Sequence, residues 1–236
     1  MKISNLETFV VDGGWRAWTY VKVETDAGLT GWGECSDYRV TNAVEGMVRD
    51  LTPLLIGKDP CAYEMRFMDM MRITRSSPGG ITARGIAGIE CALVDIAAQA
   101  RNISVVELLG GPTRDKVRLY WSHCGTARVR HGQYLPAEFA QPLRSLDDVV
   151  ALGQQVRAMG YSALKTNVIL FEKEGPRVHS PGLQQTHAHW PDRRVDAEML
   201  EGVTNHILAL RQGAGIDAAI MIDLNFNFRS ADVRAL

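Results

Sequence analysis

Hydrophobic and polar positions in the first half of the chain follow a strand pattern and then several helical patterns. Residues 18–24 alternate between Trp, Tyr and Lys on one side and Val on the other, which predicts a β-strand. A turn at residues 25–28 and a second strand over residues 29–34 complete a hairpin. Apolar spacing then predicts helices over residues 43–55, 60–72 and 82–100 and a short helix that ends at Leu109. On the longest helix, the core positions are Ile86, Ile89, Leu93 and Ile96.

Strand and helix patterns alternate in the second half of the chain. They predict strands over residues 117–122, 163–170 and 218–224 and helices over residues 146–159 and 195–211. This alternation is typical of parallel α/β units. The composition changes near residues 112–116, so we expect an α+β domain over 1–114 and the first part of a (β/α) barrel over 115–236. A complete (β/α)₈ barrel needs about 250 residues, so we expect only about the first three βα units.

A polar segment with three prolines, residues 171–194, interrupts this alternation and is longer than an ordinary βα loop. Loops of this kind on the carboxyl-terminal face of a barrel cover or line the active site. The segment contains His179, His187 and His189. We expect these histidines to be solvated or part of a lid; the alternatives are a contact with a sugar hydroxyl or a metal-binding pair at 187 and 189.

Composition excludes several functional classes. The 26 basic and 27 acidic residues give a net charge of −1, which argues against nucleic-acid binding. We find neither a signal peptide nor a run of about 18 apolar residues, so we expect no membrane association and a soluble, cytoplasmic protein. The four cysteines have no zinc-site spacing, and we expect buried free thiols, of which Cys124 is the one that could face the site.

Two short motifs place polar side chains at the carboxyl ends of predicted strands. Lys165 and Asn167 are two residues apart on one strand, so both side chains point to the same side. Asp223 and Asn225 repeat this spacing on the next predicted strand. A cation beside a hard oxygen ligand suits a site for Mg²⁺ and an anionic substrate. The alternative is an ordinary surface lysine and an ordinary aspartate, and the occurrence of both motifs on consecutive strands weakens it.

Three further blocks carry a family resemblance. Residues 25–34 (TDAGLTGWGE), 87–96 (AGIECALVDI) and 105–111 (VVELLGG) stand in the order found in the mandelate racemase/muconate lactonizing enzyme group of the enolase superfamily. Together with Lys165 and Asp223, they make the chain resemble this group over essentially its whole length apart from the 171–194 segment. The resemblance implies an α+β capping domain that closes over the carboxyl-terminal mouth of a modified (β/α)₈ barrel.

The resemblance also implies residue roles. In this superfamily three carboxylates on successive barrel strands bind Mg²⁺, and Asp223 matches the first of them. Lys165 would neutralise the substrate carboxylate, and Asn225 would hydrogen-bond that carboxylate or a neighbouring hydroxyl. Arg16, in the loop before the first long strand, would contact the distal end of the substrate; simple packing or exposure of Arg16 is the alternative. His123 could face the same site.

Position 167 narrows the expected reaction. Racemases and cycloisomerases of the group tend to have a second lysine where this chain has Asn167, and asparagine cannot abstract a proton. The Lys-x-Asn pattern resembles sugar-acid dehydratases of the galactonate type, although those enzymes often have histidine in place of Asn225. We therefore expect Mg²⁺-dependent dehydration of a sugar acid to a 2-keto-3-deoxy acid, with the general base outside this chain.

Two other interpretations of the function remain open. One is a racemase, epimerase or cycloisomerase of the same superfamily, and another is a catalytically incomplete fragment. We expect a small-molecule sugar acid as the ligand, no nucleic-acid or membrane partner, and assembly into a homo-oligomer. We also expect Trp18 and Trp32 to pack in the core of the first domain.

Overall fold

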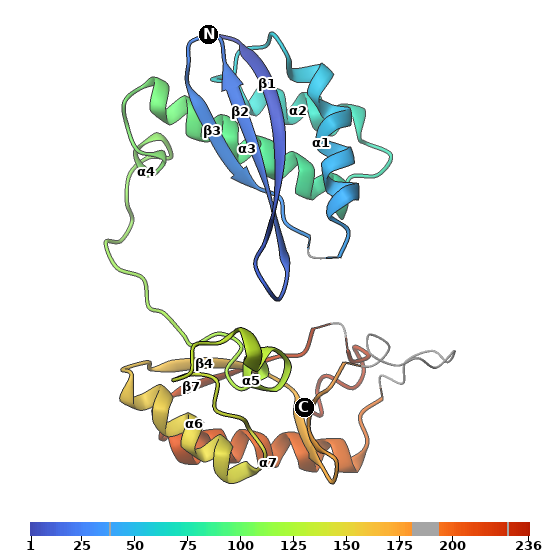
Figure 1. Cartoon of the computed structure of the whole chain (residues 1–236), viewed down its shortest axis with the longest axis vertical. Coiled ribbons are helices and arrows are strands. Elements are labelled where there is room, and N and C mark those ends of the chain that lie inside the picture. The colour runs from blue at the N-terminus through green and yellow to red at the C-terminus, as the bar shows by residue number, and fades with distance from the viewer. Residues whose placement is uncertain (38, 181–193, 226) are drawn as a thin grey trace. The chain divides into compact units, whose positions relative to one another are not determined.

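The computed structural model describes residues 1–37, 39–180, 194–225 and 227–236 (Figure 1). The chain divides into two compact units, Met1–Asp115 and Lys116–Leu236. Within the described residues, no helix is both long and apolar enough to cross a membrane.

The first unit contains an antiparallel three-stranded sheet. Its strands are β1 (Ile3–Asp12), β2 (Ala17–Thr25) and β3 (Thr30–Glu34), and they lie in the order β1-β2-β3. Val21 and Val23 of the central strand are fully buried, while the alternate positions on β2 are half-exposed. The alternation of residues 18–24 is therefore confirmed, but Trp18 lies on the half-exposed face and outside the core cluster, so the prediction that it packs in the core is wrong.

Helices α1 (Thr41–Leu55) and α3 (Ile81–Ala100) cover this buried face of the sheet (Figure 1). Helix α2 (Tyr63–Ile73) packs against α1 and α3, and the single turn α4 (Val105–Leu108) follows α3. The four isoleucine and leucine positions predicted for the core of α3 are each 2% exposed or less. Strand β3 approaches α3 so closely that a Cβ on Gly33 would lie 1.9 Å from the carbonyl oxygen of Gly88. Glycine at position 33 is therefore required by the contact between strand and helix.

The prediction that Trp32 packs in the core is wrong. Trp32 is 48% exposed and contacts Phe9 on the uncovered face of the sheet, with 5.5 Å between ring centroids. The reason is strand alternation, because the glycines on either side of Trp32 face α3 and the indole must point the other way.

The second unit is built on a parallel strand pair with two helices packed against each other (Figure 1). Strands β4 (Ala163–Asn167) and β7 (Ala219–Asp223) form the pair, and α6 (Leu146–Ala158) and α7 (Ala197–Ala214) are the helices. Leu152 and Leu210 lie in the core between these helices and the strands. The predicted alternation of strand and helix is confirmed here.

Three details of the second unit differ from the sequence prediction. The segment predicted as a strand over residues 117–122 makes only one bridge, between Trp121 and Leu164. The predicted strand 163–170 ends at Asn167, after which β5 (Ile169–Glu172) and β6 (Gly175–Val178) form a separate hairpin across the start of the polar segment. A short helix α5 (Thr126–His131) and a 3₁₀ turn (Gly132–Tyr134) also follow the first strand segment.

A buried histidine on α7 leads to a prediction on pH and stability. His206 is 1% exposed, its ring lies 6.1 Å from that of Phe171, and burial lowers its pKa to about 4. Between that value and its usual pKa of about 6.5, the unfolded chain binds more protons than the folded chain. The free energy of unfolding should therefore fall as the pH drops through this window, by up to about 3 kcal/mol from this residue.

Urea unfolding of the wild type and of His206→Leu at pH 7 and pH 4.5 measures this contribution. Carboxylates also titrate in this range, so the decisive quantity is the difference between the two proteins. We expect the wild type to lose more stability than the variant on acidification, and equal losses would contradict a neutral buried His206.

Candidate active site

The two polar motifs at strand ends meet on the parallel pair of the second unit. The register of β4 and β7 places Asn167 opposite Asp223. Lys165 Nζ lies 3.2 Å from Asp223 Oδ2, and the two side chains are 25% and 38% exposed. The structure thus brings together an ammonium and a carboxylate at an open strand edge.

Asp223 stays ionised in this arrangement. Burial raises the pKa of its carboxyl, but the Asn225 N–H, the Lys165 ammonium and, last, the charge of His123 lower it, and the net pKa is below the usual value. The N–H of Asn225 donates to Asp223 Oδ1 at 3.0 Å. The hydrogen bond to Asp223 raises the pKa of Lys165. Both groups are therefore charged near neutral pH, as a site for an anionic substrate requires.

Asn167 holds three elements together. Its Nδ2 donates to the backbone carbonyl of Asp223 at 3.0 Å, and its Oδ1 accepts from Thr126 Oγ1 at 2.9 Å. Thr126 Oγ1 also accepts from the backbone N–H of Asn167 at 3.2 Å. The side chain is 7% exposed. With both ends of its amide engaged, Asn167 links β4 to β7 and to the first residue of α5.

The remaining predicted site residues, Asn225 and Arg16, lie in different units. Asn225 is exposed and has the left-handed backbone angle φ of 50°, which directs its N–H to the Asp223 carboxylate. Arg16 is in the first unit, between β1 and β2, where its guanidinium lies 3.7 Å from the ring centroid of Trp18 and 4.7 Å from that of Trp15. Stacking on two indoles is the environment that the structure describes for Arg16.

Sequence patterns did not identify a bulge beside Lys165. The Lys165 N–H donates to the carbonyl of Trp121 at 2.8 Å, and the Lys165 carbonyl accepts from the Cys124 N–H at 2.8 Å. In a regular parallel ladder these two partners would be two residues apart, but here they are three apart. Ser122 and His123 therefore both lie opposite Lys165.

The bulge and its neighbours add polar groups to the site. His123 is exposed and has a φ of 52°, and its Nδ1 lies 3.0 Å from Ser122 Oγ. The ring of Tyr120 has its centroid 5.7 Å from Lys165 Nζ. The alternation of residues 117–122 could have indicated Tyr120 as facing the same side as Ser122, but the bulge depends on pairing with β4 and has no sequence signature.

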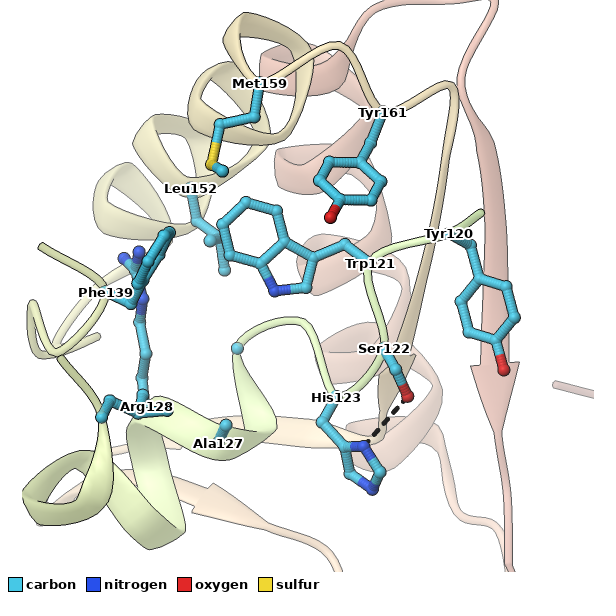
Figure 2. A pocket seen from close by; sticks show the side chains of 12 residues that line it. Tyr120, Trp121, Ser122, His123, Ala127, Arg128, Phe139, Leu152, Met159 and Tyr161 are labelled. Atoms are coloured by element: carbon cyan, nitrogen blue, oxygen red, sulfur yellow. Dashed lines mark hydrogen bonds between the residues drawn. The ribbon is translucent and has the colours of Figure 1, made fainter. Parts of the chain in front are cut away.

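The other side of this strand segment lines a hydrophobic cavity of about 320 Å³. Figure 2 shows Trp121 pointing into it, away from Tyr120, with Phe139, Tyr161 and Leu152 around the indole. The Trp121 ring lies 5.8 Å from Phe139 and 5.7 Å from Tyr161, measured between centroids. Neither Lys165 nor Asp223 lines this cavity, but Tyr120, Ser122 and His123 do, so the cavity borders the polar strand-end site.

The described residues supply one metal ligand of the type expected. The Asp223 carboxylate is a hard oxygen donor at an accessible position. Within the part of the chain that the structure describes, no three His, Cys, Asp or Glu residues are grouped so as to hold a metal ion. Asp223 could therefore contribute to a Mg²⁺ site but could not form one alone.

The candidate histidines and cysteines have other environments. His179 is 6% exposed and stacks on Phe228 at 5.1 Å, so the prediction of a solvated or lid residue is wrong for it. His187 and His189 lie outside the described residues. All four cysteines are free thiols as predicted, but only Cys35 and Cys124 are buried. Cys124 is 0% exposed and belongs to the hydrophobic core of the second unit, and burial raises the pKa of its thiol to about 12.

Several known proteins have sequences similar to that of this chain. Residues 14–110 match the family described as mandelate racemase / muconate lactonizing enzyme, N-terminal domain. A D-galactonate dehydratase of Klebsiella pneumoniae (strain 342) is 32% identical over 95% of this chain and 48% of its own length. A D-galactonate dehydratase of Variovorax paradoxus (strain S110) is 37% identical over 62% of this chain and 35% of its own length. The chain thus spans about half the length, or less, of these curated relatives.

Solved structures share the fold over nearly the whole chain. One is the structure of a protein from Burkholderia xenovorans strain LB400 that is named as an L-alanine-DL-glutamate epimerase. It matches with a TM-score of 0.90 and 34% sequence identity, and the match covers 98% of this chain and 57% of that chain. A second structure under the same name is bound to magnesium and fumarate. A protein of Mesorhizobium loti named as a dehydratase has a TM-score of 0.78 at 28% identity, over 100% of this chain and 56% of its own. The fold is shared among proteins whose names indicate different reactions.

Proposed function

The chain resembles the mandelate racemase group of the enolase superfamily and its galactonate-type dehydratases, and from this premise we propose that the protein is a Mg²⁺-dependent lyase that dehydrates a sugar acid to a 2-keto-3-deoxy acid. The observation that carries the proposal is the Lys165–Asp223 pair, with Asn167 in place of a second base. We also propose that the second unit is the first part of a (β/α) barrel, since its parallel strands are joined through helices.

The chain's own residues bind and position the substrate. Lys165 holds a fixed positive charge at the strand end and would pair with the substrate carboxylate, which makes the neighbouring α-proton easier to remove. Asp223 would hold Mg²⁺ together with further ligands, and the bound ion would supply charge that stabilises an enediolate. Asn167 keeps the two strands in register through its bonds to Thr126 and to the Asp223 carbonyl.

The environment of Asn167 favours elimination over racemisation. A racemase needs a proton acceptor on each face of the α-carbon, and an amide does not accept a proton near neutral pH. Asn167 is also buried and bonded at both ends of its amide. One base and one acid are sufficient for loss of water. An epimerase is the second candidate, because a structural neighbour with a TM-score of 0.90 is named as one.

The test is an assay of the full-length protein with MgCl₂ and a panel of aldonates, including D-galactonate, in D₂O. Formation of a 2-keto-3-deoxy acid that stops on addition of EDTA supports the proposal. Exchange of the α-hydrogen for deuterium without loss of water would instead identify an epimerase. The family resemblance also leads us to propose that the protein binds a small-molecule ligand and forms a homo-oligomer. Light scattering of the full-length protein would test the oligomeric state.

A further inference from the structure

The bulge opposite Lys165 places a histidine at the site in a strained conformation. His123 has a φ of 52°, in the left-handed region that only a few per cent of non-glycine residues adopt, histidine more often than most. Bulges of this kind redirect side chains and occur next to active sites. The two flanking hydrogen bonds to Lys165 hold the bulge in place. Such strain is retained where surrounding structure fixes it, and it is often found at functional positions.

The proposed dehydration requires an acid, because a hydroxyl group leaves poorly unless it is protonated. Asn225 lies two residues after Asp223, the candidate metal ligand, but its amide is not acidic enough to donate a proton. Lys165 already has the role of pairing with the substrate carboxylate, and its ammonium lies 3.2 Å from Asp223 Oδ2. Neither of these two residues at the strand edge is therefore suited to be the acid.

The described histidines other than His123 do not meet this need. His179 is buried against Phe228, and burial lowers its pKa. His206 lies in the core of α7 and is neutral near pH 7. His131 is at the end of α5, where its ring contacts Tyr134. His123 alone among the described histidines is exposed and opposite Lys165, and it is among the groups whose charge acts on Asp223.

We propose that His123 is the general acid of the dehydration, an inference that rests on the proposed function. As the base takes the α-proton, the C–H electrons form the enediolate. These electrons then form the new double bond while the Cβ–O bond breaks with its electron pair on oxygen. An imidazolium N–H of His123 gives its proton to that oxygen, so water leaves and His123 becomes neutral. His123 regains a proton from solvent, and the enol product tautomerises to the 2-keto acid.

The test separates removal of the α-proton from loss of water. Asparagine tolerates a positive φ, so His123→Asn should fold, and circular dichroism and thermal unfolding check this. In the full-length protein with MgCl₂ and the aldonate that the wild type turns over best, we expect product formation to fall by about 10²–10⁴-fold. Exchange of the α-hydrogen with D₂O should continue at a rate within about tenfold of the wild type. The matched control is His131→Asn, which should change neither rate.

Each result decides the assignment. Loss of elimination with retained exchange supports His123 as the acid, and partial recovery of elimination by added imidazole in His123→Gly would strengthen it. Retained elimination in His123→Asn overturns the assignment and leaves the proposed function intact. Equal loss of exchange and elimination means that His123 binds substrate or supports the fold, which also overturns it. A wild type that dehydrates no aldonate of the panel overturns the proposed function and this inference together.

Discussion

Replacement of Asp223 by asparagine is expected to lower turnover of the aldonate by the full-length protein by about 1,000-fold or more. The substitution keeps the shape of the side chain but removes the charge that would bind Mg²⁺ and that now pairs with Lys165. A metal ion contributes several kcal/mol to a transition state that develops negative charge. A loss of about 4 kcal/mol corresponds to a factor of about 1,000 in rate.

The stability of the fold should change little in the same variant. The Lys165–Asp223 pair is 25% and 38% exposed, and pairs of this kind contribute less than about 1 kcal/mol. Steady-state kinetics at several MgCl₂ concentrations, with thermal unfolding alongside, measures both effects. Asp217→Asn, an exposed carboxylate before β7, is the control and should retain activity. Full activity of Asp223→Asn with an unchanged Mg²⁺ requirement would exclude Asp223 as a ligand.

A large loss of stability at neutral pH is expected from Gly213→Ala. Gly213 lies where α7 crosses α6, and a Cβ there would be 2.0 Å from the carbonyl oxygen of Val150. Alanine favours a helix over glycine by about 1 kcal/mol. The clash is with backbone, however, so the helices must separate, and overpacking of this kind costs about 3 kcal/mol. The clash outweighs the propensity, and we expect a net loss of about 2 kcal/mol in the free energy of unfolding.

Gly202→Ala on the same helix is the matched control. Its added Cβ would meet only the end of the Leu170 side chain, at 2.8 Å from Cδ2, and that side chain can move. We expect its unfolding free energy, measured in urea, to stay within about 1 kcal/mol of the wild type. If Gly213→Ala were as stable as Gly202→Ala, that result would contradict the close contact between α6 and α7 at Gly213.

Local patterns predicted those parts of the molecule whose cause is local. The apolar spacing of α3 identified four core positions because helix periodicity alone decides which side is buried. The i,i+2 spacing within each polar motif likewise indicated that its two side chains lie on one side of a strand. The distance of 3.2 Å between Lys165 Nζ and Asp223 Oδ2 shows that the two motifs are neighbours in the structure. Both inferences need only the geometry of a single element.

Features that depend on distant partners could not be predicted in this way. The pattern of residues 163–170 predicted one strand, but its last two residues belong to β5, which pairs with β6 rather than extending β4. The anchoring of Asn167 by Thr126 joins residues 41 positions apart. The strained backbone of His123 arises from hydrogen bonds to Lys165, which the sequence around residue 123 does not indicate.

The separation in sequence between β4 and β7 has a consequence for the order of folding. The strands of the first unit are joined by short turns, whereas Asn167 and Asp223 meet across 56 residues. Closing that long loop costs more chain entropy, and non-local pairs form more slowly than local ones. During synthesis the first unit leaves the ribosome earlier and can fold before β7 exists. The charged pair then forms after the sheet of the first unit, an order that the kinetics of amide protection in β2 and β4 would record.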